Sequence, residues 1–356
     1  MKAYITSTGI ISPQETHNGV DFPGSVREVV SNRLLCIEPD YKVLINPLQL
    51  RRMPRILKMG LAAARLCINR SGGINPDGII VGTGLGCLDN LEKFLLEILD
   101  NKEHITSVLP FINSTHNAVA AHIAMLLQNH GYNLTYCHRG FSFESALDDA
   151  LMNLEEKAAS HILLGGIDES TDDFMLLHSY LGYWKKPVSN LSLLEDKTPG
   201  SIAGEGSAFF MLSSVPSENH YAIVDGVHTF ITPDTAKEDE IIPEIDRFLK
   251  DHDTDKKDIS LFLTGMNGDI GFDLLYSRIN QHYFCQQTGM AWYKHLCGEY
   301  YTSSSYALWL ASVILKSQSI PKITELVPPG KREIEKILIY NHTRNTEHAL
   351  ILLSHG

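Results

Sequence analysis

The chain has 356 residues, which is enough for two ordinary domains or for one large two-lobed domain. With 44% hydrophobic and 20% charged residues, its composition is ordinary for a soluble globular protein with a sizeable core. The formal net charge of -12 argues against a general nucleic-acid or anionic-membrane surface, so an acidic partner would need a local basic patch, for which Leu50–Lys58 and Lys185–Lys186 are candidates.

Cysteine usage and the N-terminal segment indicate the compartment. Six scattered cysteines include no Cys-x-x-Cys pair, which argues against a zinc site and a disulfide framework: Cys36, Cys67, Cys87, Cys137, Cys285 and Cys297. The first residues read as a strand without leader features, and no apolar run reaches membrane-spanning length. We therefore expect a cytoplasmic, soluble protein without a metal.

In chain order, the expected elements follow the same succession twice. The first series is an apolar strand, a β-rich run with a Gly-rich turn, a turn into an Ala-rich helix, and two paired strands: 3–12, 78–95, 139–154, 161–170 and 205–214. The second series has the same order: 221–231, 260–279, 301–318 and 336–354. Continuous apolar strands indicate sheets buried under helices on both faces. The sequence thus predicts an α/β protein with two similar halves, residues 1–215 and 216–356.

Six motifs in this order resemble the β-ketoacyl synthase family of the thiolase fold. They are the opening "TSTGIISP", the stretch "INPLQLRRMPRILKMGLAAARLC", the turn "GIIVGTGLG", the segment "PFINSTHNAVAAHIAMLLQNHGYN" with Asn117, His122 and Gly131, the Gly-Gly strand "HILLGGIDES", and "GSIAGEGSAFFMLSS" with its Gly-Glu-Gly. The resemblance covers most of the chain. It implies a five-layer αβαβα sandwich built from the two similar halves, and dimerisation through the region around Phe111–Leu127.

The position of the family's nucleophilic cysteine falls on a glycine. Between Asn117 and Gly166 the spacing follows the family without a gap, and in that register the nucleophile corresponds to Gly140, at the start of a helix. A helix N-terminus favours a thiolate, but glycine offers neither thiol nor base. A second register makes Cys137 the nucleophile and needs three extra residues before the helix. We expect the Cys137 side chain to point away from the site, inside a strand.

The two catalytic histidines of the family are also replaced. Their positions correspond to Gly265 and Glu299, although the accompanying Asp273 and Lys294 are retained. The family's histidines donate hydrogen bonds to the thioester enolate, whereas an ionised glutamate only accepts them. A structural Lys294–Glu299 ion pair is the favoured interpretation over a catalytic dyad.

The loop that gates the acyl pocket in the family is replaced by "NHTRNTE", residues 341–347. We expect the former active site to be lined by His138, Arg139, Lys294, Asn341 and His342. Two interpretations apply to His138 and Arg139. They are either ordinary polar residues at a strand end or hydrogen-bond donors to an anion or to a partner.

The resemblance therefore implies a ketosynthase homologue without catalytic residues. It would act like a chain-length factor, as the silent partner of an active ketosynthase in fatty-acid or polyketide-type elongation. No cofactor is expected except phosphopantetheine carried by an acyl carrier protein. One alternative is an active synthase or acyltransferase that uses Cys137, with His138 or Glu299 as base. Another is a homodimeric scaffold that binds an acyl carrier protein or a lipid.

Overall fold

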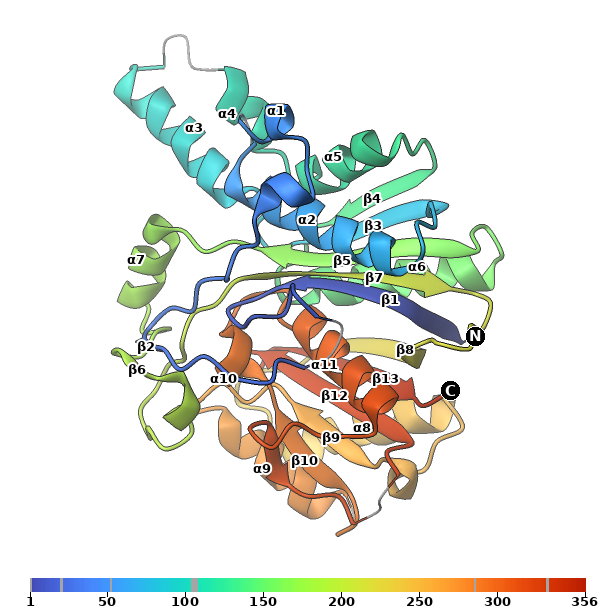
Figure 1. Ribbon diagram of the computed structural model, residues 1–356. Helices are drawn as coiled ribbons and strands as arrows, with labels where there is room; N and C mark the ends of the chain where they lie inside the picture. The colour runs from blue at the N-terminus through green and yellow to red at the C-terminus, as the bar shows by residue number, and fades with distance from the viewer. Residues whose placement is uncertain (1, 20–21, 52, 104–107, 285, 331–332) are drawn as a thin grey trace.

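The computed structural model describes residues 2–19, 22–51, 53–103, 108–284, 286–330 and 333–356, so Arg52 and Cys285 lie outside the described residues. A mixed sheet with the strand order β11-β10-β9-β12-β13-β8-β1-β7-β5-β3-β4 runs through the molecule. The N-terminal half lies above and the C-terminal half below in Figure 1, with both chain ends on the same side. None of the described helices is both long and apolar enough to cross a membrane.

The two halves share one strand order and one set of strand directions. In the N-terminal half, β3 lies parallel to β4 and β5, and β7 lies antiparallel to β5 and β1: β1 (Ala3–Ile11), β3 (Gly78–Gly82), β4 (Tyr132–Tyr136), β5 (His161–Asp168) and β7 (Gly206–Ser213). In the C-terminal half the corresponding strands pair in the same way: β8 (Ala222–Ile231), β9 (Leu261–Thr264), β10 (Gly289–Trp292), β12 (Lys336–Thr343) and β13 (Glu347–Ser354). The repeated element order is thus a repeated topology.

Two features add to this plan. The short strand β11 (Glu325–Val327) extends the C-terminal half as an antiparallel edge strand, which the sequence did not predict. Antiparallel pairing of β1 with β8, residues 3–5 with residues 222–224, joins the two half-sheets. The predicted division after residue 215 falls in the connection between β7 and β8. A separate two-stranded ladder consists of β2 (Val30–Ser31) and β6 (Val188–Ser189).

The five layers are held together by three hydrophobic clusters, one around each layer of helices. The middle cluster contains α6 (Ser142–Glu155) and α11 (Ser304–Ser317) between the two half-sheets. The outer clusters contain α2 (Arg55–Arg70) with α5 (Ala118–Leu127), and α8 (Glu238–Asp251) with α9 (Asp273–His282). Side chains alternate along each strand, so Ile80 faces the middle layer while Ile79 faces the outer one. The expected αβαβα sandwich is confirmed (Figure 1).

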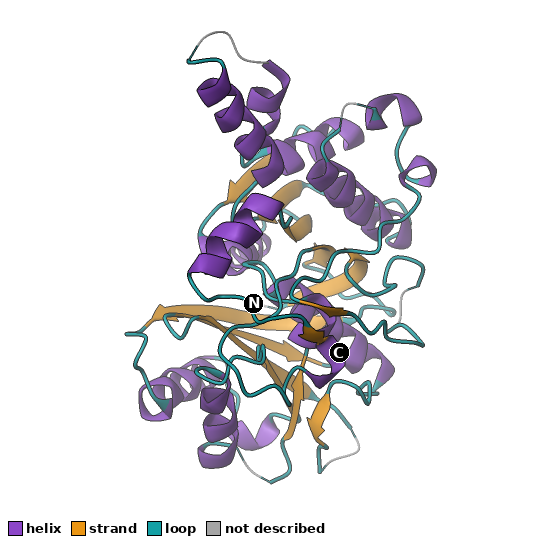
Figure 2. Cartoon of the chain, turned by 90° about the vertical axis from the view of Figure 1, so that its left-hand side faces the viewer, coloured by secondary structure: helices purple, strands orange, loops and turns teal. Residues whose placement is uncertain are grey.

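Several helices lie outside these layers: α1 (Pro47–Leu50), α3 (Leu88–Asp100), α4 (Val108–Asn113) and α7 (Asp172–Tyr180). The short helix α10 (Lys294–Cys297) is buried, and its Leu296 and Cys297 belong to the middle cluster. Helices α3 and α4 contact each other through the rings of Phe94 and Phe111, whose centroids are 5.2 Å apart, and together project from the N-terminal half (Figure 2).

Two of the motifs meet at the start of α2. The Arg55 guanidinium donates hydrogen bonds of 2.7 and 2.5 Å to the carboxylate of Glu205, the central residue of the Gly-Glu-Gly motif. The Glu205 side chain is fully buried, and it also accepts hydrogen bonds from the backbone amides of Cys36 and Ser170. Buried charges are tolerated when they are paired and hydrogen-bonded in this way. Arg55 therefore neutralises the buried carboxylate of Glu205 and does not contribute to a basic surface patch.

Candidate functional site

The turn before α6 places Gly140, the residue predicted to correspond to the family's nucleophile, at the start of a buried helix. Gly140 is buried in a 3-10 turn, Arg139–Phe141, directly before the helix, and its backbone amide donates a 3.1 Å hydrogen bond to Oε2 of Glu347 on β13. A Cβ atom on residue 140 would overlap Oγ1 of Thr343 and Oε2 of Glu347. A cysteine does not fit here unless the side chains of Thr343 and Glu347 move, and the amide of Gly140 already donates its hydrogen bond to a carboxylate.

The first histidine position is also filled by a neighbouring side chain. Gly265 follows β9, and a Cβ atom there would overlap the amide oxygen of Asn341 on β12. Asn341 is buried, and its Oδ1 has no hydrogen-bond partner among the described residues. The space that a histidine would need at residue 265 is thus occupied from the adjacent strand.

At the second histidine position, Glu299 forms the expected ion pair. Nζ of Lys294 lies 2.8 and 2.7 Å from the two carboxylate oxygens of Glu299, and Nδ2 of Asn267 donates a 2.6 Å hydrogen bond to the same group. The Lys294 side chain is only 1% exposed. Both oxygens of Glu299 are engaged, which fits an interior ion pair better than an acid–base catalyst.

The turn before α6 and Glu299 line the same cavity, which has a volume of about 200 Å³. Glu299 lines it with Arg139 from the turn before α6 and with Thr343, Arg344 and Glu347 from the β12–β13 hairpin. An aromatic group forms a further part of the wall, from α7 and the segment that follows it: Phe174, His178, Tyr183 and Trp184. The cavity therefore lies between the two halves, at Glu299 and the turn that contains Gly140, two of the positions predicted to correspond to catalytic residues.

Sequence reasoning missed Asp168 at the end of β5. This fully buried carboxylate accepts hydrogen bonds from the side chain of Thr83, the amide of Gly84, and both the amide and hydroxyl of Thr302. Burial raises the pKa of Asp168, while these four hydrogen bonds favour its charged form. Asp168 connects the two halves at the wall of the cavity. The only sequence feature that pointed to it is its place at the end of a buried strand.

Cys137 lies just beyond β4 rather than inside a strand, and its side chain is exposed. Its Sγ lies 3.4 Å from the carbonyl oxygen of Gly84, and it is not among the residues that line the cavity. Burial of the sulfur, with a smaller effect of Asp168, raises the pKa of Cys137. A raised thiol pKa lowers the thiolate fraction, which is the reverse of what a nucleophile needs.

The other predicted lining residues divide among different places. Arg139 lines the cavity, while Lys294 lies behind Glu299 and His138 is exposed beside the ring of Phe141. His342 is buried on the outer face of β12, where its ring stacks on Tyr276 at a centroid distance of 4.7 Å. Burial lowers the pKa of His342 well below its usual range, so the ring is neutral. Only part of the predicted lining therefore reaches the cavity.

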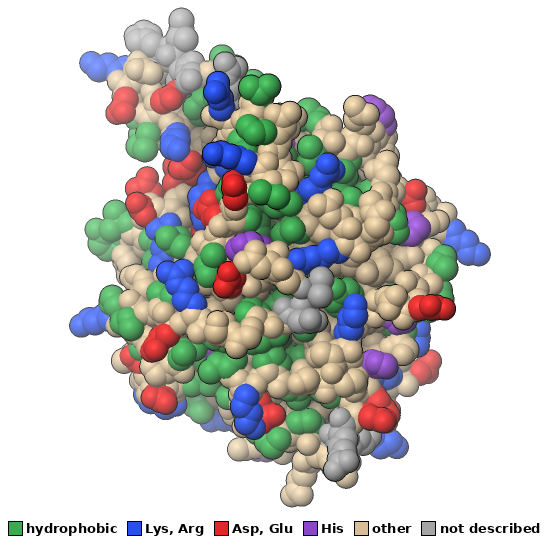
Figure 3. Space-filling model, viewed as in Figure 1, with side chains coloured by type: hydrophobic (Ala, Val, Ile, Leu, Met, Phe, Trp, Pro, Cys, Tyr) green, Lys and Arg blue, Asp and Glu red, His purple; other side chains and the backbone are tan. Residues whose placement is uncertain are grey.

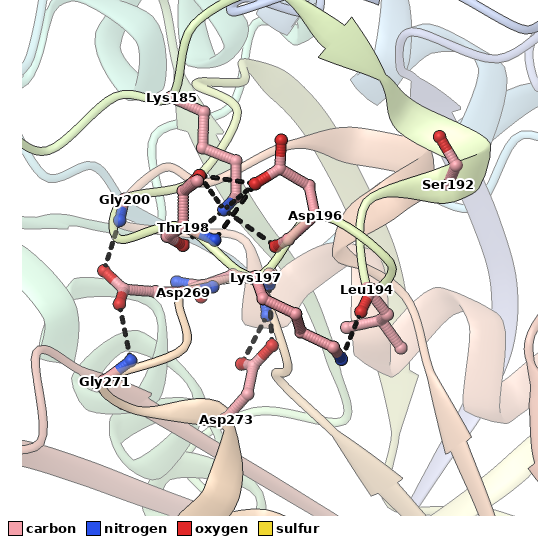
Figure 4. A network of polar contacts seen from close by, with 12 residues as sticks. Lys185, Ser192, Leu194, Asp196, Lys197, Thr198, Gly200, Asp269, Gly271 and Asp273 are labelled. Carbon is pink, nitrogen blue, oxygen red and sulfur yellow. Dashed lines mark hydrogen bonds and ion pairs between the residues drawn. The ribbon is translucent and has the colours of Figure 1, made fainter.

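The segment between α7 and β7 is fixed over the cavity by buried polar contacts (Figure 4). Nζ of Lys185 bonds Oδ1 of Asp196 at 3.2 Å and Oγ1 of Thr198 at 2.9 Å, and the Lys185 side chain is fully buried. Asp269 from the other half accepts hydrogen bonds from the amides of Gly200 and Gly271. Lys185 therefore does not contribute to a basic surface patch, and on the face shown in Figure 3 basic and acidic side chains are interspersed.

Glu144, near the start of α6, is fully buried, and its carboxylate oxygens have no hydrogen-bond partner that meets ordinary geometry within the described part of the chain. Burial raises its pKa to about 7, an effect that the nearby Lys294 partly offsets. In the described ranges, no group of three or more His, Cys, Asp or Glu residues is arranged to hold a metal ion.

No family model and no curated protein sequence matches the chain. Many solved structures resemble it, and three of them do so over nearly its full length as follows. The ishigamide ketosynthase/chain length factor aligns with a TM-score of 0.82 at 16% identity, covering 100% of this chain and 99% of that one. A β-ketoacyl synthase from Burkholderia phymatum STM815 gives 0.80 at 12% identity, with coverage of 100% and 99%. A type II polyketide acyl-carrier protein in complex with its ketosynthase, bound to the hexaketide, gives 0.74 at 13% identity, with 99% of both chains covered. The chain has the fold of the ketosynthases, as its motifs predicted.

Proposed function

We propose that this chain is a non-catalytic β-ketoacyl synthase homologue that acts, like a chain-length factor, as the structural partner of an active ketosynthase. The observation that carries the proposal is the state of the three catalytic positions. Thr343 and Glu347 fill the space beside Gly140, Asn341 fills the space beside Gly265, and Lys294 neutralises Glu299. The side chains of Thr343, Glu347 and Asn341 occupy the space that catalytic side chains would need, so the packing of the site depends on the absence of those side chains.

This packing opposes each step of a condensation. A ketosynthase forms a thioester on its cysteine and stabilises the enolate of the extender unit with hydrogen-bond donors. Gly140 cannot be acylated, and its amide donates to the carboxylate of Glu347. A second carboxylate, that of Glu299, stands where a donor would be needed. The proposed chemistry of elongation therefore takes place on the partner's cysteine.

An apolar surface on the N-terminal half supports a partner. Strand β4 ends the sheet order, so one of its edges is unpaired within the described residues. Large apolar side chains are exposed on β4 (Leu134), on the adjacent α5 (Met125) and on the projecting pair α3 and α4: Leu95, Leu96, Leu99, Val108, Leu109, Phe111 and Ile112. Exposed apolar side chains in such numbers are a feature of protein interfaces. The segment expected at the interface, residues 111–127, contains the end of helix α4 and the whole of helix α5.

The growing chain would be delivered by an acyl carrier protein, with phosphopantetheine as the carrier's own arm. One structural neighbour is described as an acyl-carrier protein in complex with its ketosynthase, and another as a ketosynthase/chain length factor. By analogy of fold, this chain would contribute part of the wall of the partner's acyl tunnel. The acyl chain and the pathway are not part of the proposal.

Two other functions give different outcomes in the same tests. An enzyme that uses Cys137 would show stoichiometric acylation that disappears in Cys137→Ala, but the raised pKa of this thiol and its place outside the cavity argue against this reaction. A homodimeric scaffold for an acyl carrier protein or a lipid would form a stable dimer alone and would not need an active ketosynthase.

Co-expression with an intact ketosynthase encoded beside this chain tests the proposal. Isolated protein should neither decarboxylate malonyl-acyl carrier protein nor become acylated, whereas the co-purified pair should elongate. Leu134→Asp or Phe111→Asp should abolish co-purification, because each places a charge in the apolar surface. Tyr180→Asp, on the exposed side of α7, is the matched control and should leave the complex intact. A stable monomer together with full product in the absence of this chain would exclude the partner role.

A further inference from the structure

Two arginines of the cavity have no anionic partner. Arg139 and Arg344 line it from opposite halves of the molecule, and neither guanidinium forms an ion pair or side-chain hydrogen bond within the described part of the chain. Arg344 lies instead over the ring of Tyr183, with its guanidinium carbon 4.1 Å from the ring centroid. A guanidinium held against an aromatic face keeps its donors available to a ligand.

Both arginines also have backbone conformations that disfavour their residue type. The φ angle is +48° at Arg139 and +52° at Arg344, in the left-handed region that glycine and asparagine occupy most readily. Arg344 begins the three-residue turn between β12 and β13, residues 344–346, and a positive φ at such a position favours asparagine or glycine. Backbone strain of this kind is concentrated at ligand sites.

The carboxylates of the cavity wall already have donors. Lys294 and Asn267 bind Glu299, the Gly140 amide binds Glu347, and the amides of Gly200 and Gly271 bind Asp269. Four hydrogen bonds engage Asp168 in the same way, and the amide of Asp89 donates to the fifth carboxylate of the wall, that of Glu169. Among the charged side chains that line the cavity, the two guanidiniums are therefore the ones without a hydrogen-bond partner in the described residues, and guanidiniums favour carboxylate and phosphate oxygens.

The rest of the wall suits a flat, apolar body. His178 packs against Phe174 at a centroid distance of 4.0 Å and against Tyr183 at 5.1 Å, and Trp184 completes this aromatic group. A cavity of about 150 Å³ with an apolar lining accepts benzene, so the volume of about 200 Å³ found here has room for one ring and a small charged group.

We propose that the cavity between the halves is a binding site for a small organic anion, a carboxylate or phosphate monoester on an unsaturated ring or chain, with Arg139 and Arg344 holding the charged group. The site goes beyond the partner role: a chain without catalytic residues would keep its former active centre as a ligand site. Binding is measured on the chain alone, so its failure leaves the partner role standing, and loss of the partner role leaves the site standing.

Calorimetric titration of the full chain with benzoate, phenyl phosphate and benzylamine tests the site. Benzoate or phenyl phosphate should bind, and benzylamine, which has the same ring and the opposite charge, should not. Arg139→Gln and Arg344→Gln should each weaken anion binding by about ten- to a hundredfold, since each removes a charged hydrogen-bond donor. Added salt should also weaken binding, because the attraction is electrostatic.

Arg247→Gln on α8 is the matched control and should bind anions like the unchanged chain, because Arg247 pairs with Glu244 far along the C-terminal half. Circular dichroism and thermal unfolding of each variant separate loss of the site from loss of the fold. The proposal is refuted if neither anion binds at millimolar concentration, if benzylamine binds in their place, or if a well-folded Arg139→Gln/Arg344→Gln double variant binds the anions unchanged.

Discussion

Removing one member of the Lys294–Glu299 ion pair should destabilise the protein more than removing both. The ammonium of Lys294 is almost completely buried and lies 2.7 and 2.8 Å from the two carboxylate oxygens of Glu299. Glu299→Leu leaves that ammonium buried without its counterion, and Lys294→Met leaves the carboxylate with only the amide of Asn267. Breaking a buried pair from one side costs about 3–5 kcal/mol of unfolding free energy.

The double variant Lys294→Met/Glu299→Leu should behave differently. It replaces both charges by apolar groups of similar volume, which is often neutral for a buried pair. We therefore expect it to lose less than about 2 kcal/mol, well below the sum of the two single losses, because residues in direct contact are not additive.

Urea unfolding at pH 7, followed by tryptophan fluorescence and by circular dichroism, measures all three variants against the unchanged chain. Lys322→Met is a matched control, since Lys322 is exposed and its pair with Glu325 should contribute less than about 1 kcal/mol. If the losses of the two single variants sum to that of the double variant within about 0.5 kcal/mol, the two side chains are not coupled and the ion-pair interpretation is refuted.

Other perturbations give equally distinct outcomes. Gly140→Cys should lower the melting temperature by about 1–4 °C through overpacking, and the variant should remain inactive. Adding Thr343→Ala and Glu347→Ala should recover most of that stability. A Gly140→Cys variant that is more stable than the unchanged chain would contradict the steric argument. Burial lowers the pKa of His348 to about 4, so between pH 6.5 and 4 the unfolded chain binds the extra proton and stability falls with falling pH; His348→Asn should lose less over this range in acid-unfolding titrations. Burial raises the pKa of Glu144 to about 7, so the folded state binds the extra proton between pH 4.5 and 7, and stability from this group falls as pH rises; Glu144→Gln should show a smaller fall, and an identical pH profile would refute the assignment. Alkylation of Cys137 by iodoacetamide should be slow at pH 7 and rise steeply above pH 9, and a fast reaction at neutral pH would restore the enzyme hypothesis.

Local patterns predicted an α/β protein with two similar halves, and the family resemblance supplied the five-layer arrangement. Alternation and apolar runs indicate strands, turn residues delimit them, and the same order in both halves indicates a repeated unit. The strand β11 escaped notice because three residues carry too little pattern. That Gly140, Gly265 and Glu299 stand at the family's catalytic positions stays a prediction, drawn from residue identity at the family's spacing.

The contacts that fill the site were not predictable in this way. The carboxylate of Glu347 reaches the amide of Gly140 across 207 positions in the sequence, and no local signal announces such an approach. Arg344 lies in residues 341–347, which the sequence marked only as a replacement of the family's gating loop. Its contact with Tyr183 depends on how the two halves meet. Likewise, His342 was expected in the site because of its place in the chain, but strand alternation turns it to the opposite face of the sheet.

The pairing of β1 has a consequence for biosynthesis. Ala3–Ile11 leaves the ribosome well before its partners, because its antiparallel neighbour β7 follows about 200 residues later and its other neighbour, β8, later still. At a synthesis rate of about 5–20 residues per second, a largely buried strand waits about 10–40 s before it finds its first partner. An unpaired apolar strand is prone to aggregate during such a delay. The nascent chain should therefore bind holding chaperones through its N-terminal residues until β7 emerges, and slow codons placed before β7 should lower the soluble yield more than the same codons placed after it.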